Sequence, residues 1–511
     1  METLMYCNQC QEAAGNKACT IKGACGKDSE LANLMDELKE YLKVLASQIV
    51  MKEGCKEEKL FIMNSLFKLI TNANFSHDSL QKAVKQAQIY TNRQDVVAYY
   101  EADEDLNALK SLIMGGLMGL CAYHSHAIHL GYEDDDIHQF MVQTLAGLNE
   151  CQEVSQLLEV TDLCGTYGVK VMALLDQANT STYGNPEITR VNIGVGTRPG
   201  ILVSGHDLKD LEQLLAQSEA SGVDIYTHSE MLPAHYYPKL KQYKHLVGNY
   251  GNAWWQQASE FESFQGPIIF TTNCIVPPKA KAGYLNKVYA TGNCDYPGFR
   301  RIKELADGQK DFSDVIIQAQ TCASPQAIES GEIVGGFAHN QVLALADQLV
   351  ANIKSGAIRQ FVVMSGCDGR SRTRKYYEEF AQNLKPDTII LTSGCAKYRY
   401  NKLQLKAING IPRVLDAGQC NDSYSWVIVA QKLKEVFQLN DMNDLPISFN
   451  PAWYEQKAII VLLALLHLGI KDIKVGPTLP AYLSEQTANY LVNHYGISGI
   501  TTVAEDLVSL G

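Results

Sequence analysis

Residues 200–230 read GILVSGHDLKDLEQLLAQSEASGVDIYTHSE. Two short apolar runs flank a stretch whose leucines have helical spacing, and each run ends in polar residues. This order of strand, helix and strand is typical of a doubly wound α/β fold with a parallel sheet. In such sheets, functional groups gather beyond the carboxyl ends of the strands. His206 and Glu230, which follow the two runs, are therefore candidate site residues.

Four further β-rich runs occur later in the chain, and each leads into a cysteine. They are GPIIFTTNC ending at Cys274, IRQFVVMSGCDG with Cys367, DTIILTSGC ending at Cys395 and RVLDAGQC ending at Cys420. Because the carboxyl ends of parallel strands meet at one edge, loops from distant strands can bring such residues together. The runs therefore predict a thiol-rich site that is assembled by the fold.

The first third of the chain has a different pattern. From about Ser29 to Ala178, apolar residues recur at three- and four-residue steps, which predicts a helix bundle. The α/β pattern starts after Tyr183, and a break near Gly335-Gly336-Phe337 divides it. We expect an amino-terminal loop with helix bundles, followed by two Rossmann-like doubly wound α/β domains. The expected domains cover residues 1–180, 181–338 and 339–511.

Composition and charge exclude some classes of partner. The 511 residues carry a formal net charge of -12 at pH 7, and such a field repels nucleic acid and anionic membranes. Residues 1–7 show no secretion signal, and the longest apolar segment, Ala458 to Ile470, is too short to span a bilayer. We therefore expect a cytoplasmic protein. In that compartment its 14 cysteines are expected to be metal ligands or buried thiols.

Four cysteines lie close together near the amino terminus. Cys7, Cys10, Cys19 and Cys25 have the spacing C-x2-C-x8-C-x5-C among glycines and small polar residues. Four thiolates in a short loop bind either zinc or an iron–sulfur cluster, and the spacing leaves both open. Zinc ribbons usually repeat C-x2-C in both halves. The x5 spacing in the second half therefore favours the bulkier iron–sulfur centre.

Harder ligands accompany the scattered cysteines. A site that mixes thiolates with imidazole and carboxylate can hold iron while leaving one position open. His206 in SGHDL, Glu230 in THSEMLPAH and Glu455 in WYEQK meet that description. Taken singly, a histidine after a strand is more often an ordinary polar residue, and Glu455 is a helix-start residue. The pattern alone selects the four cysteines but not the carboxylates.

Lys457 lies two residues beyond Glu455 and is a candidate donor of a proton or hydrogen bond to substrate. Since positions i and i+2 do not share a face of a regular helix, the alternative is a solvated lysine. The remaining cysteines are interpreted as packing residues. They are Cys55, Cys121, Cys151, Cys164, Cys294 and Cys322.

Together these motifs resemble one known family. The amino-terminal C-x2-C-x8-C-x5-C is followed in order by SGHDL, THSEMLPAH, TTNCIVPPK, SGCDGR, TSGCAKYRYNKL, DAGQCNDSYS and WYEQKA. This set is similar to the motifs of the hybrid cluster protein family, also called prismane proteins or hydroxylamine reductases. The resemblance covers essentially the whole chain. One motif alone would be weak, whereas the ordered set is highly specific.

The resemblance implies two cofactors. It implies that Cys7, Cys10, Cys19 and Cys25 bind a [4Fe-4S] cluster. It also implies a hybrid [4Fe-2O-2S] cluster, with Cys367 as a persulfide and Lys457 close by. Its implied ligands are His206, Glu230, Cys274, Cys367, Cys395, Cys420 and Glu455. The implied catalytic residues are Glu455, Lys457 and Cys367.

The resemblance also implies a reaction. The leading hypothesis is an oxidoreductase that reduces hydroxylamine to ammonia and water, or nitric oxide to nitrous oxide, in protection against nitrosative stress. Electrons would pass from an unidentified donor protein through the amino-terminal cluster to the hybrid cluster. An alternative from another class is a nitric-oxide-dependent redox regulator that transfers nitrosyl groups to partner proteins. A third hypothesis, a structural zinc protein, needs only the cysteines.

Overall fold

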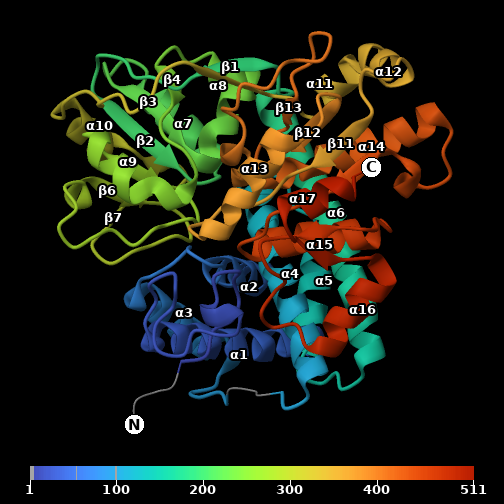
Figure 1. Ribbon diagram of the computed structural model, residues 1–511. Coiled ribbons are helices and arrows are strands. Elements are labelled where there is room, and N and C mark those ends of the chain that lie inside the picture. The colour runs from blue at the N-terminus through green and yellow to red at the C-terminus, as the bar shows by residue number, and fades with distance from the viewer. Residues whose placement is uncertain (1–4, 53, 98–100, 511) are drawn as a thin grey trace.

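A computed structural model describes residues 5–52, 54–97 and 101–510 (Figure 1). The chain is a mixed helical and parallel-sheet α/β protein with several domains. In Figure 1 the helical part lies below two sheet-containing parts, one coloured green to yellow and the other orange. Of residues 1–7, on which the expected lack of a secretion signal rests, residues 1–4 lie outside the described residues.

The helical part confirms the pattern predicted from the amino-terminal third. Its helices are α1 (Ser29–Lys52), α2 (Lys56–Lys68), α3 (His77–Thr91), α4 (Glu104–His129), α5 (Asp135–Gly147) and α6 (Val154–Tyr183). Asp103 and Asp134 begin α4 and α5, because their side chains accept backbone N–H groups of the first turn. The helical pattern ends at Tyr183, slightly beyond the predicted Ala178.

The first sheet has six parallel strands in the order β4-β3-β2-β5-β6-β7. They are β2 (Gly200–Ser204), β3 (Asp224–His228), β4 (Leu246–Asn249), β5 (Ile268–Phe270), β6 (Val288–Ala290) and β7 (Arg300–Arg301). Its helices are α7 (Leu208–Ser218), α8 (Pro238–Lys241), α9 (Gln257–Phe264) and α10 (Ser313–Gln320). The β2–α7–β3 unit is the one predicted from residues 200–230.

The second sheet has four parallel strands in the order β13-β12-β11-β14. They are β11 (Gln360–Val363), β12 (Thr388–Thr392), β13 (Val414–Asp416) and β14 (Ile447–Phe449). The helices of this half are α11 (His339–Ala344), α12 (Ala346–Lys354), α13 (Lys375–Asn383), α14 (Tyr424–Phe437), α15 (Gln456–His467), α16 (Glu485–Tyr495) and α17 (Val503–Val508).

Short strand pairs and 3-10 turns complete the described chain. The pairs are β1 (Thr189–Asn192) with β10 (Glu332–Gly335), β8 (Lys303–Glu304) with β9 (Lys310–Asp311), and β15 (Lys474–Val475) with β16 (Ser498–Gly499). The 3-10 turns include η1 (Ala14–Asn16), η2 (Ser229–Tyr236), η5 (Arg372–Arg374), η6 (Cys395–Arg399) and η7 (Cys420–Ser423). The predicted break near Gly335 follows β10, between the two sheets.

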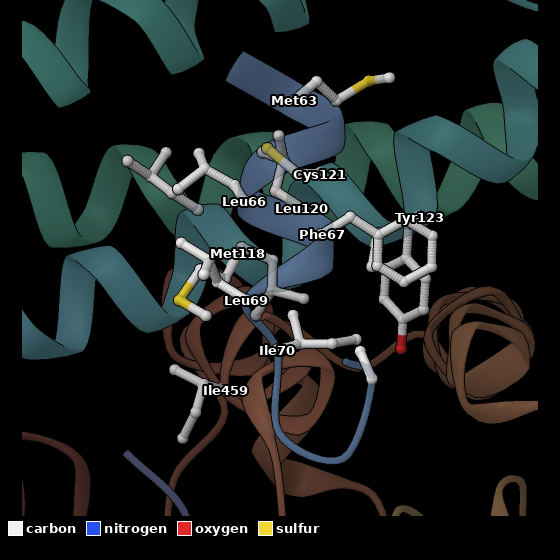
Figure 2. Packing of buried hydrophobic residues seen from close by; sticks show 14 of the residues in the cluster. Met63, Leu66, Phe67, Leu69, Ile70, Met118, Leu120, Cys121, Tyr123 and Ile459 are labelled. Carbon is white, nitrogen blue, oxygen red and sulfur yellow. The ribbon is translucent and has the colours of Figure 1, made fainter. Parts of the chain in front are cut away.

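Helix α15 belongs to the carboxyl-terminal part of the chain, but it packs against α4 and α6 of the helical part. Figure 2 shows Ile459 of α15 near Met118 of α4 and Ile70, which follows α2. All three side chains are buried in one apolar core. The predicted domain boundaries remain predictions, but the residues that begin α15 are held by the helical part as well as by the second sheet.

Helix α4 corrects one prediction. It is long and apolar enough to cross a membrane, so Ala458 to Ile470 is not the longest apolar segment. Lys110 and three histidines, at positions 124, 126 and 129, interrupt the apolar run and conceal its length in the sequence. Most of its most apolar window, 72%, is buried inside the protein, where it forms core. The length and apolar composition of α4 are therefore also those of a buried core helix.

Candidate metal centre

The residues predicted after strands lie at the facing carboxyl ends of the two sheets. In sheet order they are Glu230, His206 and Cys274 after β3, β2 and β5, and Cys420, Cys395 and Cys367 after β13, β12 and β11. Several hydrogen bonds join the loops of the two sheets here. The backbone N–H of Cys420 donates to Glu230 Oε2 at 3.0 Å, and Ser229 Oγ lies 3.0 Å from Cys395 Sγ.

Glu455 follows a strand as well. β14 is the edge strand beside β11, and the chain runs from it directly to Glu455 and α15. The β14 segment, Ile447–Phe449, is interrupted by Ser448 and leads into no cysteine, so the sequence predicts no strand there. All seven predicted ligands therefore lie beyond strands of two parallel sheets. We call them the assembled site: His206, Glu230, Cys274, Cys367, Cys395, Cys420 and Glu455.

His206, Glu230 and Cys420 form the tightest group in this site. One potential ligand atom from each lies within 4.8 Å of the others. Nε2 of His206 is 3.6 Å from Oε2 of Glu230. Each of the three residues is buried. An imidazole, a carboxylate and a thiol from three separate loops thus point at one small volume.

Glu455 and Lys457 reach the same volume from the start of α15. Glu455 is the N-cap of α15, which confirms its helix-start prediction, and its Oε2 accepts the backbone N–H of Lys457 at 2.8 Å. Lys457 Nζ lies 2.9 Å from His206 Nε2 and 3.6 Å from Glu455 Oε1. Glu455 has extended backbone angles and lies outside the helix, so the i, i+2 rule does not separate the two side chains. The solvated alternative for Lys457 is wrong, because the residue is 1% exposed.

The other three thiols of the site pack beside aromatic side chains. Cys274 and Cys395 are buried in one cluster with Trp254 and Tyr454, and Cys367 packs against it. Cys274 has a positive φ of 81°, a conformation that is uncommon for any residue other than glycine. Such strained backbone is concentrated at functional sites.

Two glycines explain why Cys367 and Cys395 lie on adjacent loops. Gly366 has φ 110° and Gly394 has φ 80°, both in the left-handed region. A Cβ on Gly394 would lie only 2.3 Å from the carbonyl oxygen of Gly366. Only glycine permits this approach, which accounts for the S-G-C pattern that both loops share.

Burial controls the protonation of this site. Burial lowers the pKa of His206 well below its usual value, and the neighbouring Lys457 ammonium lowers it further. Because Lys457 Nζ can only donate, His206 Nε2 must be the unprotonated nitrogen, and Nδ1 carries the hydrogen. Nδ1 lies 2.8 Å from Thr272 Oγ1. The neutral imidazole thus presents Nε2, a metal-ligand atom, to the site.

The pKa values of the thiols and of Lys457 are all raised, but for different physical reasons. Burial raises the pKa of Cys274 and Cys395 well above the usual value and that of Cys367 to about 12. Burial alone would lower the pKa of Lys457, but the negative charge of neighbouring groups, the Glu455 carboxylate first, outweighs it and raises that pKa. Without a metal these thiols are held neutral, so a bound cation is what would make them thiolates.

The four amino-terminal cysteines form a separate group, which we call the amino-terminal quartet. Cys7 and Cys19 pair as a two-residue antiparallel bridge, with N–H to O distances of 3.1 and 2.8 Å. Burial and then the charges of Cys25 and Cys7 raise the pKa of Cys10 well above its usual value. Cys7, Cys10 and Cys25 line one pocket. Cys7 and Cys25 are partly exposed, as is Cys367 of the assembled site, whereas the other six members of that site are buried.

Arg374 connects the quartet to the assembled site. Its Nη2 donates to Gln11 Oε1 at 2.9 Å, and its Nη1 donates to the carbonyl oxygen of Cys367 at 3.3 Å. The backbone N–H of Gln11, next to Cys10, also donates to the carbonyl oxygen of Tyr454 at 3.0 Å. Two short connections therefore link the two groups of cysteines.

Sequence reasoning missed the residues that orient the candidate ligands. Asn273 accepts from Lys457 Nζ at 2.8 Å, and its Nδ2 lies 3.3 Å from Cys274 Sγ. Gln419 donates to the carbonyl oxygens of His206 and Glu230. Tyr123 lies near Cys420, which is one cause of the raised pKa of the Tyr123 hydroxyl after burial. Asn273 and Gln419 immediately precede cysteines in the quoted motifs, which is a usable signal, whereas Tyr123 has none.

The remaining cysteines fit the packing interpretation only in part. Cys121, Cys164 and Cys294 are buried thiols, as predicted. Cys55 is exposed and begins α2, so its packing prediction is wrong. Its isolated position before a charged helical turn has no apolar neighbours in sequence, which is the signal that was overlooked.

Comparison with known proteins gives a consistent result. The family model described as "Prismane/CO dehydrogenase family" matches residues 5–508. A protein of Porphyromonas gingivalis named "Hydroxylamine reductase" is 55% identical, with 100% of both chains covered. Proteins of the same name from Bacteroides fragilis and Clostridium novyi are 54% and 53% identical, covering 98% of this chain and 99% and 98% of theirs.

Solved structures show the fold alone. Carbon monoxide dehydrogenase IV from Carboxydothermus hydrogenoformans is 16% identical, with a TM-score of 0.60 over 98% of this chain and 92% of that chain. The match extends over both sheets and the helical part, since it covers nearly the whole chain. The family model and the three full-length relatives lead to one conclusion: this chain belongs to the Prismane/CO dehydrogenase family.

Proposed function

We propose that this chain is an iron–sulfur oxidoreductase that reduces hydroxylamine to ammonia and water. The observation that carries the proposal is the convergence of His206, Glu230 and Cys420, whose ligand atoms lie within 4.8 Å of one another. The name shared by the full-length relatives supports the substrate. The domain layout we propose is a helix bundle followed by two Rossmann-like domains, and the compartment is the cytoplasm.

The residues present fit a hybrid iron–sulfur–oxygen centre. The assembled site offers four thiols, one neutral imidazole and two carboxylates, a donor set that mixes soft and hard ligands. Glu230 Oε1 is buried and has no hydrogen-bond partner among the described residues. An unpaired buried carboxylate oxygen is costly, and a metal ion would satisfy it. This donor set fits the [4Fe-2O-2S] cluster, with Cys367 as the persulfide, that the family resemblance implies for the assembled site.

The quartet fits a different group. It offers four thiols and no carboxylate or imidazole, which suits a [4Fe-4S] cluster. Cys10 and Cys19 are buried, whereas Cys7 and Cys25 reach the surface. An electron from a donor at the surface can therefore enter at the quartet. The hydrogen bonds of Arg374 to Gln11 and to Cys367 then connect the quartet to the assembled site.

When bound, the hybrid cluster would supply electrons and a Lewis-acidic iron to the substrate. The chain itself supplies orientation and protons. Lys457 Nζ is a buried cation that Asn273 Oδ1 holds at 2.8 Å, so it is aimed at the site before substrate arrives. It is placed to give a proton to the oxygen that leaves as water. Glu455, 3.6 Å away, is placed to return a proton to Lys457.

The overall reaction is NH2OH + 2e⁻ + 2H⁺ → NH3 + H2O. Burial of the assembled site favours a small, neutral substrate such as hydroxylamine or nitric oxide. Reduction of nitric oxide to nitrous oxide is therefore the close variant. The same burial disfavours the alternative of nitrosyl transfer to a partner protein, because six of the seven residues are at most 7% exposed. A partner's thiol could not reach them without opening the sheets.

The test is turnover with a matched pair of variants. Anaerobically purified protein should contain iron and sulfide, and it should oxidise reduced methyl viologen only when hydroxylamine is added, with one ammonia formed per two viologens. Glu455→Gln should lose this activity and the spectrum of the hybrid cluster. Glu485→Gln, at the exposed start of α16, should change neither. Zinc without iron, or no hydroxylamine-dependent oxidation, would overturn the proposal.

A further inference from the structure

Three segments around the amino-terminal quartet are strongly basic. Residues 12–27, 277–283 and 370–375 contain nine lysines and arginines and one acidic residue, Glu12. The whole chain, by contrast, has 44 basic and 56 acidic residues. Basic residues therefore outnumber acidic residues in these three segments, although Asp28 and Glu30 directly follow the first one. We call the exposed basic residues the basic surface: Lys17, Lys22, Lys279, Lys281, Arg370, Arg372 and Lys375.

The three segments meet in space at the quartet. Arg370 Nη2 donates to the carbonyl oxygen of Ala24 at 2.9 Å, directly beside Cys25. Pro277 lies against Gly26, since a Cβ on this glycine would be 3.0 Å from Pro277 Cγ. Residues 277–283 and 370–375 thus border the loop that carries Cys19 and Cys25.

Most of this positive charge is not neutralised within the chain. Arg370 pairs with Glu12 at 2.6 Å, and Lys375 pairs with Glu379 at 3.0 Å. Within residues 5–52, 54–97 and 101–510, the other five have no carboxylate oxygen within 4.0 Å. They are Lys17, Lys22, Lys279, Lys281 and Arg372.

Two exposed apolar side chains lie among these charges. Tyr6, next to Cys7, is 62% exposed, and Ile21, between Cys19 and Cys25, is 86% exposed. A single exposed apolar side chain is common on protein surfaces and does not indicate a binding site. Here, however, Tyr6 and Ile21 both lie beside the partly exposed cysteines Cys7 and Cys25. An apolar centre with a charged rim is the usual anatomy of a protein interface.

We propose that the basic surface docks an acidic electron-carrier protein, which reduces the cluster that the amino-terminal quartet would hold. This inference rests on the proposed function. Two one-electron carriers would each be oxidised once per turnover: 2 carrier(reduced) + NH2OH + 2H⁺ → 2 carrier(oxidised) + NH3 + H2O. No bond forms between carrier and enzyme. The complex is transient, and charge complementarity raises the rate of encounter more than the affinity.

The charge pattern favours a compact protein over a polymer or a membrane. A local basic surface attracts an acidic partner of similar width, whereas the net charge of -12 repels a long polyanion or an extended anionic bilayer. Electron transfer also needs a partner whose redox centre comes close to Cys7 and Cys25. A small acidic ferredoxin meets both requirements.

The test uses the holoprotein and an acidic [2Fe-2S] ferredoxin as the probe. The double variant Lys22→Glu with Arg372→Glu reverses two charges of the basic surface. Its matched control, Lys244→Glu with Lys354→Glu, makes the same change of charge after α8 and in α12, which lie far from the quartet in Figure 1. Ferredoxin oxidation by hydroxylamine and ferredoxin binding are each measured at low and high salt, and methyl viologen serves as the small-molecule donor.

We expect the test variant to lose about tenfold or more in kcat/KM for ferredoxin at low salt, with turnover from methyl viologen unchanged. The salt dependence of the wild-type rate should be reduced in the same variant, and ferredoxin binding should weaken in parallel. The control should stay within about twofold of the wild type. Equal losses in both variants, or no loss in either, would overturn the docking proposal.

Binding separates this proposal from the proposed function. If ferredoxin binds the wild type and the control but not the test variant, while hydroxylamine is never reduced by any donor, the docking surface stands and the reductase proposal fails. If hydroxylamine is reduced with methyl viologen but the test variant still binds ferredoxin normally, the docking surface fails alone. Salt-sensitive binding to phosphatidylserine vesicles, with none to ferredoxin, would also overturn it.

Discussion

The amino-terminal quartet and the assembled site use cysteines in opposite ways. The quartet lies between Cys7 and Cys25 in one loop, is partly exposed, and is surrounded by basic residues. The assembled site draws on residues from His206 to Glu455, is largely buried, and mixes thiols with carboxylates and imidazole. The difference supports the proposed division of labour, in which the local site receives electrons from a donor at the surface and the buried site holds substrate.

The largest expected effect separates the two sites by chemistry. Cys367→Ser should abolish hydroxylamine turnover with every electron donor, because Cys367 belongs to the site that holds substrate. The spectrum of the amino-terminal cluster should persist, since the quartet does not depend on this residue. The control is Cys322→Ser, a partly exposed thiol of the first α/β region. Full activity in Cys367→Ser would contradict its place in the site.

The second prediction concerns a substitution in the amino-terminal quartet. Cys10→Ser should stop turnover driven by a ferredoxin while leaving the spectrum of the hybrid cluster intact, because electrons enter through the quartet. Turnover with methyl viologen should fall less, since a small donor can reach the inner cluster by other routes. Cys151→Ser is the matched control. Normal ferredoxin-driven turnover in Cys10→Ser would show that the quartet is not the entry point.

The third prediction concerns proton delivery inside the assembled site. Lys457→Met keeps an unbranched side chain up to Cε but removes the ammonium group, so kcat should fall by about 10²–10⁴-fold. The KM for hydroxylamine and the iron content should change little if the lysine acts on the proton and not on the cluster. Lys432→Met, on the exposed face of α14, serves as the control. An unchanged kcat would exclude Lys457 as the proton donor.

The smallest effect is expected for Thr272, which contacts the candidate ligand His206 but is not itself a candidate ligand. Thr272→Val removes the oxygen that lies 2.8 Å from His206 Nδ1, so the imidazole loses its fixed tautomer and orientation. Loss of such a partner typically costs about 10–100-fold in metal affinity or activity. Iron bound by the assembled site should decrease while iron bound by the quartet does not. Thr321→Val, an exposed threonine, should leave both unchanged.

Much of the fold was predictable because its signals are local. The strand–helix–strand pattern at residues 200–230, and each cysteine-terminated run, is confirmed as a strand of a parallel sheet. The helical spacing before Tyr183 is confirmed as well. β14 is not predicted, because Ser448 interrupts its short apolar run and no cysteine follows it, and without this strand the sequence does not show that Glu455 also follows a strand.

The site was predictable in composition but not in geometry. Strand ends select His206, Glu230 and the four cysteines, but nothing in the sequence indicates that the two sheets face each other through Cys420 and Glu230. The position of α15 depends on tertiary packing against α4 and α6, and it alone brings Lys457 to His206. The helix-face rule failed for Lys457 because Glu455 is a cap and not a helical residue.

The most direct test of this account is anomalous diffraction at the iron edge from anaerobically grown crystals. The account predicts two separate groups of iron atoms, one bound by Cys7, Cys10, Cys19 and Cys25, and one among the seven residues of the assembled site. At least one iron of the second group should contact His206 Nε2 and Glu230. A single iron group at the quartet, with none near Cys420 and Glu230, would contradict the central claim.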